Sequence, residues 1–363
     1  MPLRYCLPEV KKRGYGLGNE FIPWARAFLA AQLLDATLLP PAFGLNRRRY
    51  WRHFGTPLDD WIHHRALVRV LPCIEFTERD FVEHGGGVHG GGDLLAALRS
   101  FAARHRLAER SAWVLKTSGL WGAYAHIAPA REFIRSTLYG SLYAPRNLLR
   151  LRERLDATKL QVAMHVRLGD FRPAGEQVDY RQSANVSLPI GWFCDIARQL
   201  EAAMPGGVQF LVVSDGEPEA LRPLTDSHPC VTTRDLANSD CSDLLALADA
   251  DLLVCSASTF SAIAALISDS PYLWFGGNLY RHPEGCYSLG QFATSAPWQH
   301  QPVEAAVHDF TRAGGQWPAR GFGVENSGTV PAAALQLALT RMARRQSRYD
   351  LVGFGVSPVA PGS

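Results

Sequence analysis

Polar side chains that can bind an anion follow three apolar stretches in the second half of this 363-residue sequence. Arg167 comes directly after the first stretch, and Ser214 and Asp215 come at the end of the second. The third stretch is followed by a run of hydroxyl side chains where a helix is predicted to begin: Ser256, Ser258, Thr259 and Ser261. An arginine and a helix amino terminus can together hold a diphosphate, because both present N–H groups to anionic oxygens. The pattern therefore predicts a site for a nucleoside diphosphate.

Asp243, in a predicted helix before the third stretch, is suited to recognise a guanine. A carboxylate accepts two hydrogen bonds, and guanine offers two neighbouring donors, its N1–H and its amino group. Structural roles compete with this interpretation, since Ser258 is also a good helix cap and Asp243 a good first-turn acid. Three coincident strand ends favour a shared binding site over separate structural roles.

The three clusters meet only if the stretches before them are neighbouring strands of one sheet. Strands are predicted at 161–166, 208–213, 251–255 and 272–275, alternating with helices at 189–204, 218–224, 242–247 and 262–267. Such alternation is typical of βαβ units, and hence of a parallel sheet in an α/β fold. Open parallel sheets bind ligands at the carboxyl ends of their strands, which is where the polar clusters lie.

A glycine-rich turn in the first half of the sequence offers a second approach to a ligand. A strand at 3–8 leads to Gly14, Gly16, Gly18 and Asn19, and a helix with apolar residues at helical spacing follows. Glycines allow close approach of the backbone, although such turns often only pack a helix on a sheet. Further strands are predicted at 36–39, 66–71 and 112–115, with a helix at 94–105 and helical structure at 130–154 broken at Pro145.

The length and the 47% hydrophobic content predict a globular protein of two domains. We place an amino-terminal domain at 1–157 and a ligand-binding domain at 158–300. Residues 301–363 form a tail, whose helix at 331–345 is predicted to pack back on the amino-terminal domain.

The charge pattern argues against nucleic acid as a partner. The net charge is only +3, and the basic stripe at Arg146, Arg150, Arg152 and Arg154 has no interleaved aromatic residues. We interpret the stripe as the solvated face of a helix. The apolar stretch 21–43 is interrupted by Arg26 and Asp35, so no membrane span is predicted.

Cysteine and histidine spacing predicts neither a metal site nor disulfides. The seven cysteines are scattered singly, which favours a reducing compartment and no structural zinc. His84 and His89 flank a glycine-rich stretch without a third ligand nearby. With no recognisable signal peptide, the expected location is the cytoplasm.

Four blocks in the sequence resemble one enzyme family. The segment 165–170 resembles an H-x-R-R-x-D motif, 243–261 a helix, strand and serine-rich turn, 16–19 a G-x-G-N turn, and 210–215 a strand ending in S-D. These are motifs of the alpha-1,2 and alpha-1,6 fucosyltransferases and the related protein O-fucosyltransferases. The blocks follow the family's order over residues 14–261.

The resemblance implies a GT-B fold, with two Rossmann-like domains facing a cleft. It implies an inverting, metal-independent transfer of a sugar, fucose as the best guess, from a GDP-sugar to a hydroxyl of a glycan or small-molecule acceptor, with no cofactor. Arg167 would neutralise the β-phosphate, His165 would lie against guanine or ribose, and Asp243 would read the guanine. The diphosphate would be held by Ser258 and Thr259, with Ser214, Asp215 and Ser256 at the same edge and Gly16, Gly18 and Asn19 closing from the other domain.

The identity of the catalytic base and the donor sugar stay open at this stage. Glu176 is the first candidate for the base, with Asp170 and Glu20 as competitors. Leu168 stands where the motif has its second arginine, and Ala262 and Ile263 replace an aromatic pair. A different nucleotide sugar, or a catalytically inactive sugar-binding or nucleotide-binding protein of the same fold, are the alternatives.

Overall fold

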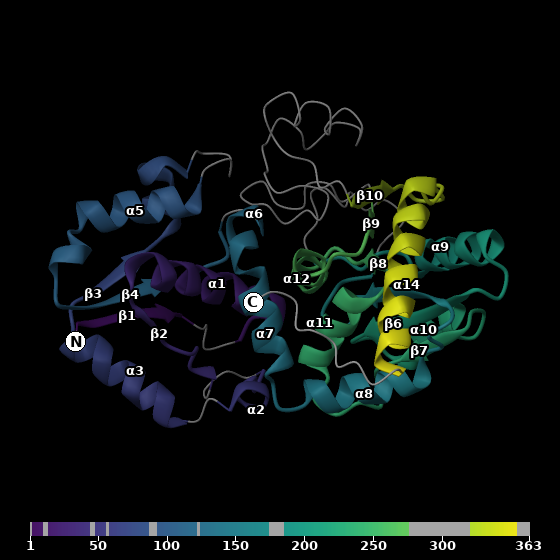
Figure 1. Cartoon of the computed structure of the whole chain (residues 1–363), viewed down its shortest axis with the longest axis horizontal. Coiled ribbons are helices and arrows are strands. Elements are labelled where there is room, and N and C mark those ends of the chain that lie inside the picture. Colours follow the sequence, from purple (N-terminus) through teal and green to yellow (C-terminus); the bar gives the residue numbers. More distant parts are fainter. Residues whose placement is uncertain are drawn as a thin grey trace.

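The computed structural model describes residues 2–9, 14–43, 48–55, 58–86, 93–121, 124–173, 185–275 and 320–353. The chain forms two α/β halves that lie side by side, each built around a parallel sheet (Figure 1). The predicted α/β class with two Rossmann-like halves, the GT-B arrangement, is therefore confirmed. Among the helices described, none is both long and apolar enough to cross a membrane.

The sheet of the amino-terminal half has four parallel strands in the order β2-β1-β4-β3. They are β1 (Leu3–Pro8), β2 (Thr37–Leu38), β3 (Cys73–Phe76) and β4 (Ala112–Thr117). The helices are α1 (Leu17–Leu34), α2 (Trp51–Phe54), α3 (Leu58–Val70), α4 (Glu78–Phe81), α5 (Leu94–Arg104), α6 (Tyr124–Ile127), α7 (Arg131–Tyr139) and α8 (Ala144–Arg154). Short π or 3₁₀ turns occupy Val82–Gly86, Leu107–Glu109 and Ala128–Ala130.

Two predictions for this half are wrong in detail. Residues 66–70 belong to helix α3, Leu71 follows its end, and the strand comes after it at β3. A six-residue apolar run fits either structure, so its periodicity did not decide between them. The helical region breaks at Gly140–Tyr143, and Pro145 lies in the first turn of α8, where its missing N–H costs no hydrogen bond.

The sheet of the carboxy-terminal half has six parallel strands in the order β10-β9-β8-β5-β6-β7. They are β5 (Leu160–Val166), β6 (Val208–Ser214), β7 (Cys230–Thr232), β8 (Leu252–Cys255), β9 (Tyr272–Phe275) and β10 (Gly321–Val324). The helices are α9 (Ile190–Ala203), α10 (Pro218–Thr225), α11 (Asp240–Asp249), α12 (Thr259–Ile267) and α14 (Ala332–Gly353). This is the Rossmann strand order, which reverses direction between β5 and β8.

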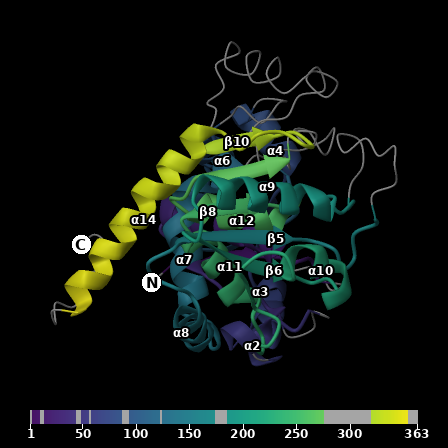
Figure 2. The same cartoon turned by 90° about the vertical axis from the view of Figure 1, so that its right-hand side faces the viewer.

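The carboxy-terminal helix α14 lies on the carboxy-terminal half. The sequence analysis placed it on the amino-terminal domain, and this prediction is wrong. It packs against β5 and β8 (Figure 2). Ala334 and Ala338 of this helix lie in the core of that half. Near its end, Arg345 pairs with the fully buried Asp251 at 2.8 Å. A buried carboxylate needs such a partner, and Asp251 belongs to the carboxy-terminal sheet.

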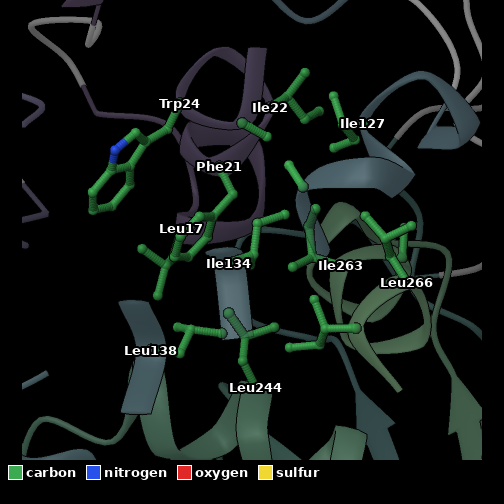
Figure 3. Close-up of a cluster of buried hydrophobic side chains, with 14 of the residues drawn as sticks. Leu17, Phe21, Ile22, Trp24, Ile127, Ile134, Leu138, Leu244, Ile263 and Leu266 are labelled. Carbon is green, nitrogen blue, oxygen red and sulfur yellow. The ribbon is translucent and has the colours of Figure 1, made fainter. Parts of the chain in front are cut away.

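One hydrophobic core joins the two halves (Figure 3). Its buried side chains come from both of them: Leu17 and Phe21 of α1, Ile134 and Leu138 of α7, Leu244 of α11, and Ile263 and Leu266 of α12. Each fully buried aliphatic or aromatic side chain contributes about 1.5–3 kcal/mol. At the centre of this interface α1 and α12 meet backbone to backbone, because a Cβ on Gly18 would lie 2.8 Å from the Thr259 carbonyl.

We expect Gly18→Ala to lower the free energy of unfolding. A methyl group at this position forces α1 and α12 apart, which costs about 1–3 kcal/mol. Gly16→Ala is the matched control, since a Cβ there meets nothing within 4 Å and should change stability by less than about 0.5 kcal/mol. Chemical denaturation of both variants checks this, and equal stabilities would show that the close contact is not needed.

Candidate functional site

The carboxyl ends of β8, β5 and β6 lie next to one another, as the sequence predicts. Val166 at the end of β5 is paired with Ser214 of β6, and Met164 with Val254 of β8. This edge includes the position between β5 and β8 where the strand order reverses, which is the binding position of open α/β sheets. The fold therefore brings the three polar clusters together.

Two of the predicted ligand hydroxyls tie the strand ends to one another. The Ser256 hydroxyl donates to the carbonyl of His165 at 2.6 Å and accepts from the N–H of Arg167 at 2.9 Å. The Ser214 hydroxyl donates to the carbonyl of Val166 at 2.6 Å and accepts from the N–H of Gly216 at 3.0 Å. In this structure both serines shape the edge of the sheet.

Arg167 lies at the centre of the edge between two carboxylates. Its Nη1 pairs with Asp215 Oδ2 at 2.5 Å, and its Nη2 with Asp170 Oδ1 at 2.5 Å. The side chain is only 19% exposed, and its Nε is buried without a hydrogen-bond partner among the described residues. The guanidinium is thus held in one orientation, with one N–H still to satisfy.

Asp215 is held in a cradle made by the loop after β5. Its Oδ1 accepts from the backbone N–H groups of Leu168 at 2.9 Å and Gly169 at 3.0 Å. Burial tends to raise the pKa of Asp215, but these two N–H groups and the Arg167 charge outweigh it and lower the pKa. Position 169 requires glycine, because a Cβ would lie 2.3 Å from the Asp215 carboxylate.

Leu168 is part of the same loop and has an apolar environment. A Cβ on Gly216 would lie 2.5 Å from the Leu168 side chain, so the leucine covers that glycine. Its side chain also packs against the hydrophobic core of the carboxy-terminal half. Leu168 therefore holds the loop after β5 in place by apolar contacts, at the position where the H-x-R-R-x-D motif has its second arginine.

His165 is buried beneath α12. Its Nδ1 lies 2.6 Å from the Ser261 hydroxyl, and its ring lies 5.0 Å from that of Phe260. Burial, and then the nearby Arg167 charge, lower the pKa of His165 to about 3, so the ring is neutral. The sequence predicts a contact with guanine or ribose, but the side chain is only 3% exposed and supports α12.

Two helix amino termini meet at this edge, those of α1 and α12. Ser258 caps α12 by accepting from the N–H of Phe260 at 3.3 Å, and the backbone of Thr259 contacts Gly18 in the first turn of α1. Nothing lies within 4 Å of a Cβ placed on Gly16, whereas Gly18 is filled by α12. Gly18 thus serves the contact between the halves, and Gly16 is the glycine with open space beside it.

Two polar residues in the first turn of α1 have different environments. The Oδ1 atom of Asn19 is buried and accepts no hydrogen bond from the described residues. Glu20 is 2% exposed, and its Oε1 accepts from the N–H of Tyr15 at 2.9 Å. Glu20 therefore stabilises the glycine turn, and Asn19 retains an acceptor for a ligand.

Asp243 has one carboxylate oxygen in use and one without a partner. Its Oδ2 accepts from the Ser239 hydroxyl at 2.8 Å, while Oδ1 is buried and has no partner within the described part of the chain. Burial raises the pKa of Asp243 to about 7, against the lowering effect of the Ser239 and Thr233 hydroxyls. A free acceptor at this place is what guanine recognition needs.

The carboxylates of Asp249 and Asp251 serve packing. Asp249 binds Arg135 and accepts from the Tyr139 hydroxyl at 2.5 Å, which joins α11 to α7. Asp251 accepts from the N–H of Gln161 at 2.9 Å in addition to its pair with Arg345. Both carboxylates hold neighbouring elements.

Of the three candidates for the catalytic base, the structure describes Asp170 and Glu20. Glu176 lies in 174–184, outside the described residues. Asp170 is 58% exposed and pairs with Arg48 Nη2 at 3.4 Å as well as with Arg167. Arg48 comes from the amino-terminal half, 122 residues away in sequence, and no sequence motif pointed to it.

No protein-family model and no curated protein sequence matches this chain. Solved structures do. A structure of POFUT1 in complex with GDP-fucose is similar with a TM-score of 0.43 and 15% identity, covering 76% of this chain and 98% of that one. The fucosyltransferase NodZ from Bradyrhizobium is similar with a TM-score of 0.45 and 13% identity, covering 74% of this chain and 94% of that one. Likeness of this degree concerns the course of the chain alone.

The raised pKa of Asp243 makes stability depend on pH in a defined direction. The pKa of an aspartate is about 3.9 in the unfolded chain. In the folded protein the pKa of Asp243 is about 7. Its contribution to stability is therefore fully present below the unfolded pKa and is lost as the pH rises through about 7. Asp243→Asn removes this loss, so the free energy of unfolding should fall less between about pH 5 and about pH 8 than in the wild type.

Asp226→Asn, at an exposed position after α10, is the matched control for the same loss of charge. It should follow the wild-type pH profile. Denaturation curves over this pH range decide the matter, and parallel profiles for Asp243→Asn and the wild type would contradict a raised pKa.

Proposed function

We propose that this chain is an inverting, metal-independent glycosyltransferase that moves a sugar from a GDP-sugar to a hydroxyl group of a glycan or another acceptor. Fucose is the first candidate for the sugar. The observation that carries the proposal is the convergence of Arg167 with the amino termini of α1 and α12 at the reversal point of the six-stranded sheet. The carboxy-terminal half would bind the donor, and the amino-terminal half the acceptor.

These groups suit the stabilisation of a departing nucleoside diphosphate. In the transfer, the acceptor oxygen forms a bond to the anomeric carbon while the bond from that carbon to the β-phosphate oxygen breaks. Negative charge then develops on the diphosphate, and fixed N–H donors around it lower the barrier. Arg167, with its orientation fixed by Asp215, is the charged donor, and the helix termini add backbone dipoles.

The preference for guanine rests on Asp243. Its Oδ1 is an acceptor without a partner among the described residues, and its Oδ2 is held by Ser239. An ionised carboxylate accepts from both guanine donors, whereas uracil has one N–H between two carbonyl oxygens. GDP-sugars are therefore favoured over UDP-sugars.

The base that takes the proton from the acceptor is proposed to be Glu176, with Asp170 as the second choice. Glu20 is less suited, because it is buried and bound to the N–H of Tyr15. Asp170 is exposed, but each of its oxygens pairs with a guanidinium.

The cytoplasm remains our proposed location. The six cysteines of the described residues are all free, and this supports a reducing compartment.

Arg167→Ala should lower kcat/KM for the GDP-sugar by about two orders of magnitude, equivalent to about 3 kcal/mol of transition-state stabilisation. It should also weaken GDP binding in calorimetry. Arg198→Ala, an exposed arginine on α9, is the control and should behave as the wild type. Near-normal turnover of Arg167→Ala, with its folding checked by melting temperature, would contradict the proposal.

Glu176→Gln should reduce turnover by about 100-fold and leave GDP affinity unchanged, since a base acts on the acceptor and not on the diphosphate. Turnover is measured at saturating donor, and affinity by calorimetry with GDP. A wild-type rate would move the base role to Asp170.

A catalytically inactive nucleotide-binding or sugar-binding protein is the second candidate. The observation in its favour is Leu168, whose packing over Gly216 leaves the end of β5 with a single guanidinium. Such a protein would bind GDP, or another nucleotide sugar, without hydrolysis or transfer. Release of GDP from GDP-fucose above background separates the two candidates.

A further inference from the structure

We propose that Arg48, from the amino-terminal half, is a second phosphate-binding guanidinium, and that the Asp170 carboxylate competes with a phosphate for the space between Arg48 and Arg167. The inference rests on the proposed function for the identity of the full ligand. It adds a binding residue that no sequence motif indicates, and it gives Asp170 a role other than that of base.

The Asp170 carboxylate bridges guanidinium groups from the two halves. Its Oδ1 lies 2.5 Å from Arg167 Nη2, and its Oδ2 lies 3.4 Å from Arg48 Nη2. The N–H groups of a guanidinium suit the oxygens of a phosphate as well as those of a carboxylate. A phosphate at the place of this carboxylate would contact both arginines.

Arg48 and the amino terminus of α1 both act on one buried side chain, that of Tyr50. Burial raises the pKa of Tyr50, whereas the positive charge of Arg48 and the backbone N–H of Leu17, at the start of α1, lower it. An anion held by Arg48 therefore lies in a region where the positive end of the α1 dipole also acts.

The two carboxylates that pair with Arg167 differ in how firmly they are held. Asp215 is fixed by two backbone N–H groups and by the glycine at 169. Asp170 is 58% exposed, and the ion pairs of exposed side chains contribute only about 0–1 kcal/mol. A diphosphate carries more charge than a carboxylate, so it displaces Asp170 and leaves Asp215 in place.

The charges of the neighbouring side chains favour the replacement of the Asp170 carboxylate by a phosphate. Arg48 and Arg167 are matched by Asp170 and Asp215, so the four side chains carry no net charge. Release of Asp170 frees the Nη2 atoms of Arg48 and Arg167 from this carboxylate, and both can then donate to the phosphate. Because Leu168 is apolar, the end of β5 supplies only Arg167, and Arg48 provides the second charge from the other half.

Calorimetry with GDP and with inorganic pyrophosphate tests the inference on the full chain. Arg48→Ala should weaken binding of both ligands about tenfold, while guanosine affinity stays unchanged. Arg52→Ala is the matched control, because this nearby arginine faces the ring of Trp51. Asp170→Asn should act in the opposite direction and tighten both affinities about threefold or more, since the competing charge is removed.

The opposite signs of the two effects keep the test sharp. If Arg48→Ala binds like Arg52→Ala, or if Asp170→Asn binds more weakly than the wild type while its melting temperature is unchanged, the inference is wrong. If the wild type binds pyrophosphate but not GDP, the proposed GDP-sugar donor is wrong. Weaker pyrophosphate binding by Arg48→Ala and tighter binding by Asp170→Asn would then still support a phosphate site between the two arginines. If the wild type binds neither, both proposals fall.

Discussion

The contact between the amino termini of α1 and α12 is the constraint on which the rest of the structure depends. Gly18 allows the first turn of α1 to reach the backbone of Thr259. Around this contact the side chains of α1, α7, α11 and α12 lie in one buried core that belongs to both halves. The default for two domains of one chain is relative motion, and a large apolar interface removes that freedom. The amino-terminal half therefore contributes the first turn of α1 to the edge of the six-stranded sheet where α12 begins.

Electrostatics at this edge follows from burial and from fixed backbone dipoles. His165 is neutral because it is enclosed, and it serves the position of α12 through Ser261. Asp215 stays ionised because two N–H groups face it, and it fixes the position of Arg167. The charged groups that remain for a ligand are thus few, and each is oriented by a neutral or oppositely charged neighbour. Arg167 is therefore already oriented by Asp215 before any ligand binds.

The sequence predicted the carboxy-terminal sheet well and the packing of its surroundings poorly. Buried parallel strands such as β5, β6 and β8 are continuous apolar runs, so their positions and the polar residues at their ends were visible. The strands β7 and β10 have the sequences Cys-Val-Thr and Gly-Phe-Gly-Val and are not continuous buried apolar runs, so they lack this pattern. The side on which α14 packs depends on the partner of Arg345, and that partner is 94 residues away.

The candidate site shows the same division. Arg167 and the cap Ser258 follow from local pattern, since their roles depend on the strand or helix that carries them. The burial of His165, the second role of Gly18 and the approach of Arg48 to Asp170 arise only when distant segments pack. The residues whose interpretation changed are those whose neighbours come from another part of the chain.

The shared core has a consequence for how such a protein can be altered. A chimera that takes one half from this chain and the other from a relative breaks the core through its middle, because Leu17 and Phe21 are packed for Ile263 and Leu266. The two halves are then not exchangeable as modules. Recombination has to carry α1 and α12 together, because the contact between Gly18 and Thr259 and the core around it need both helices.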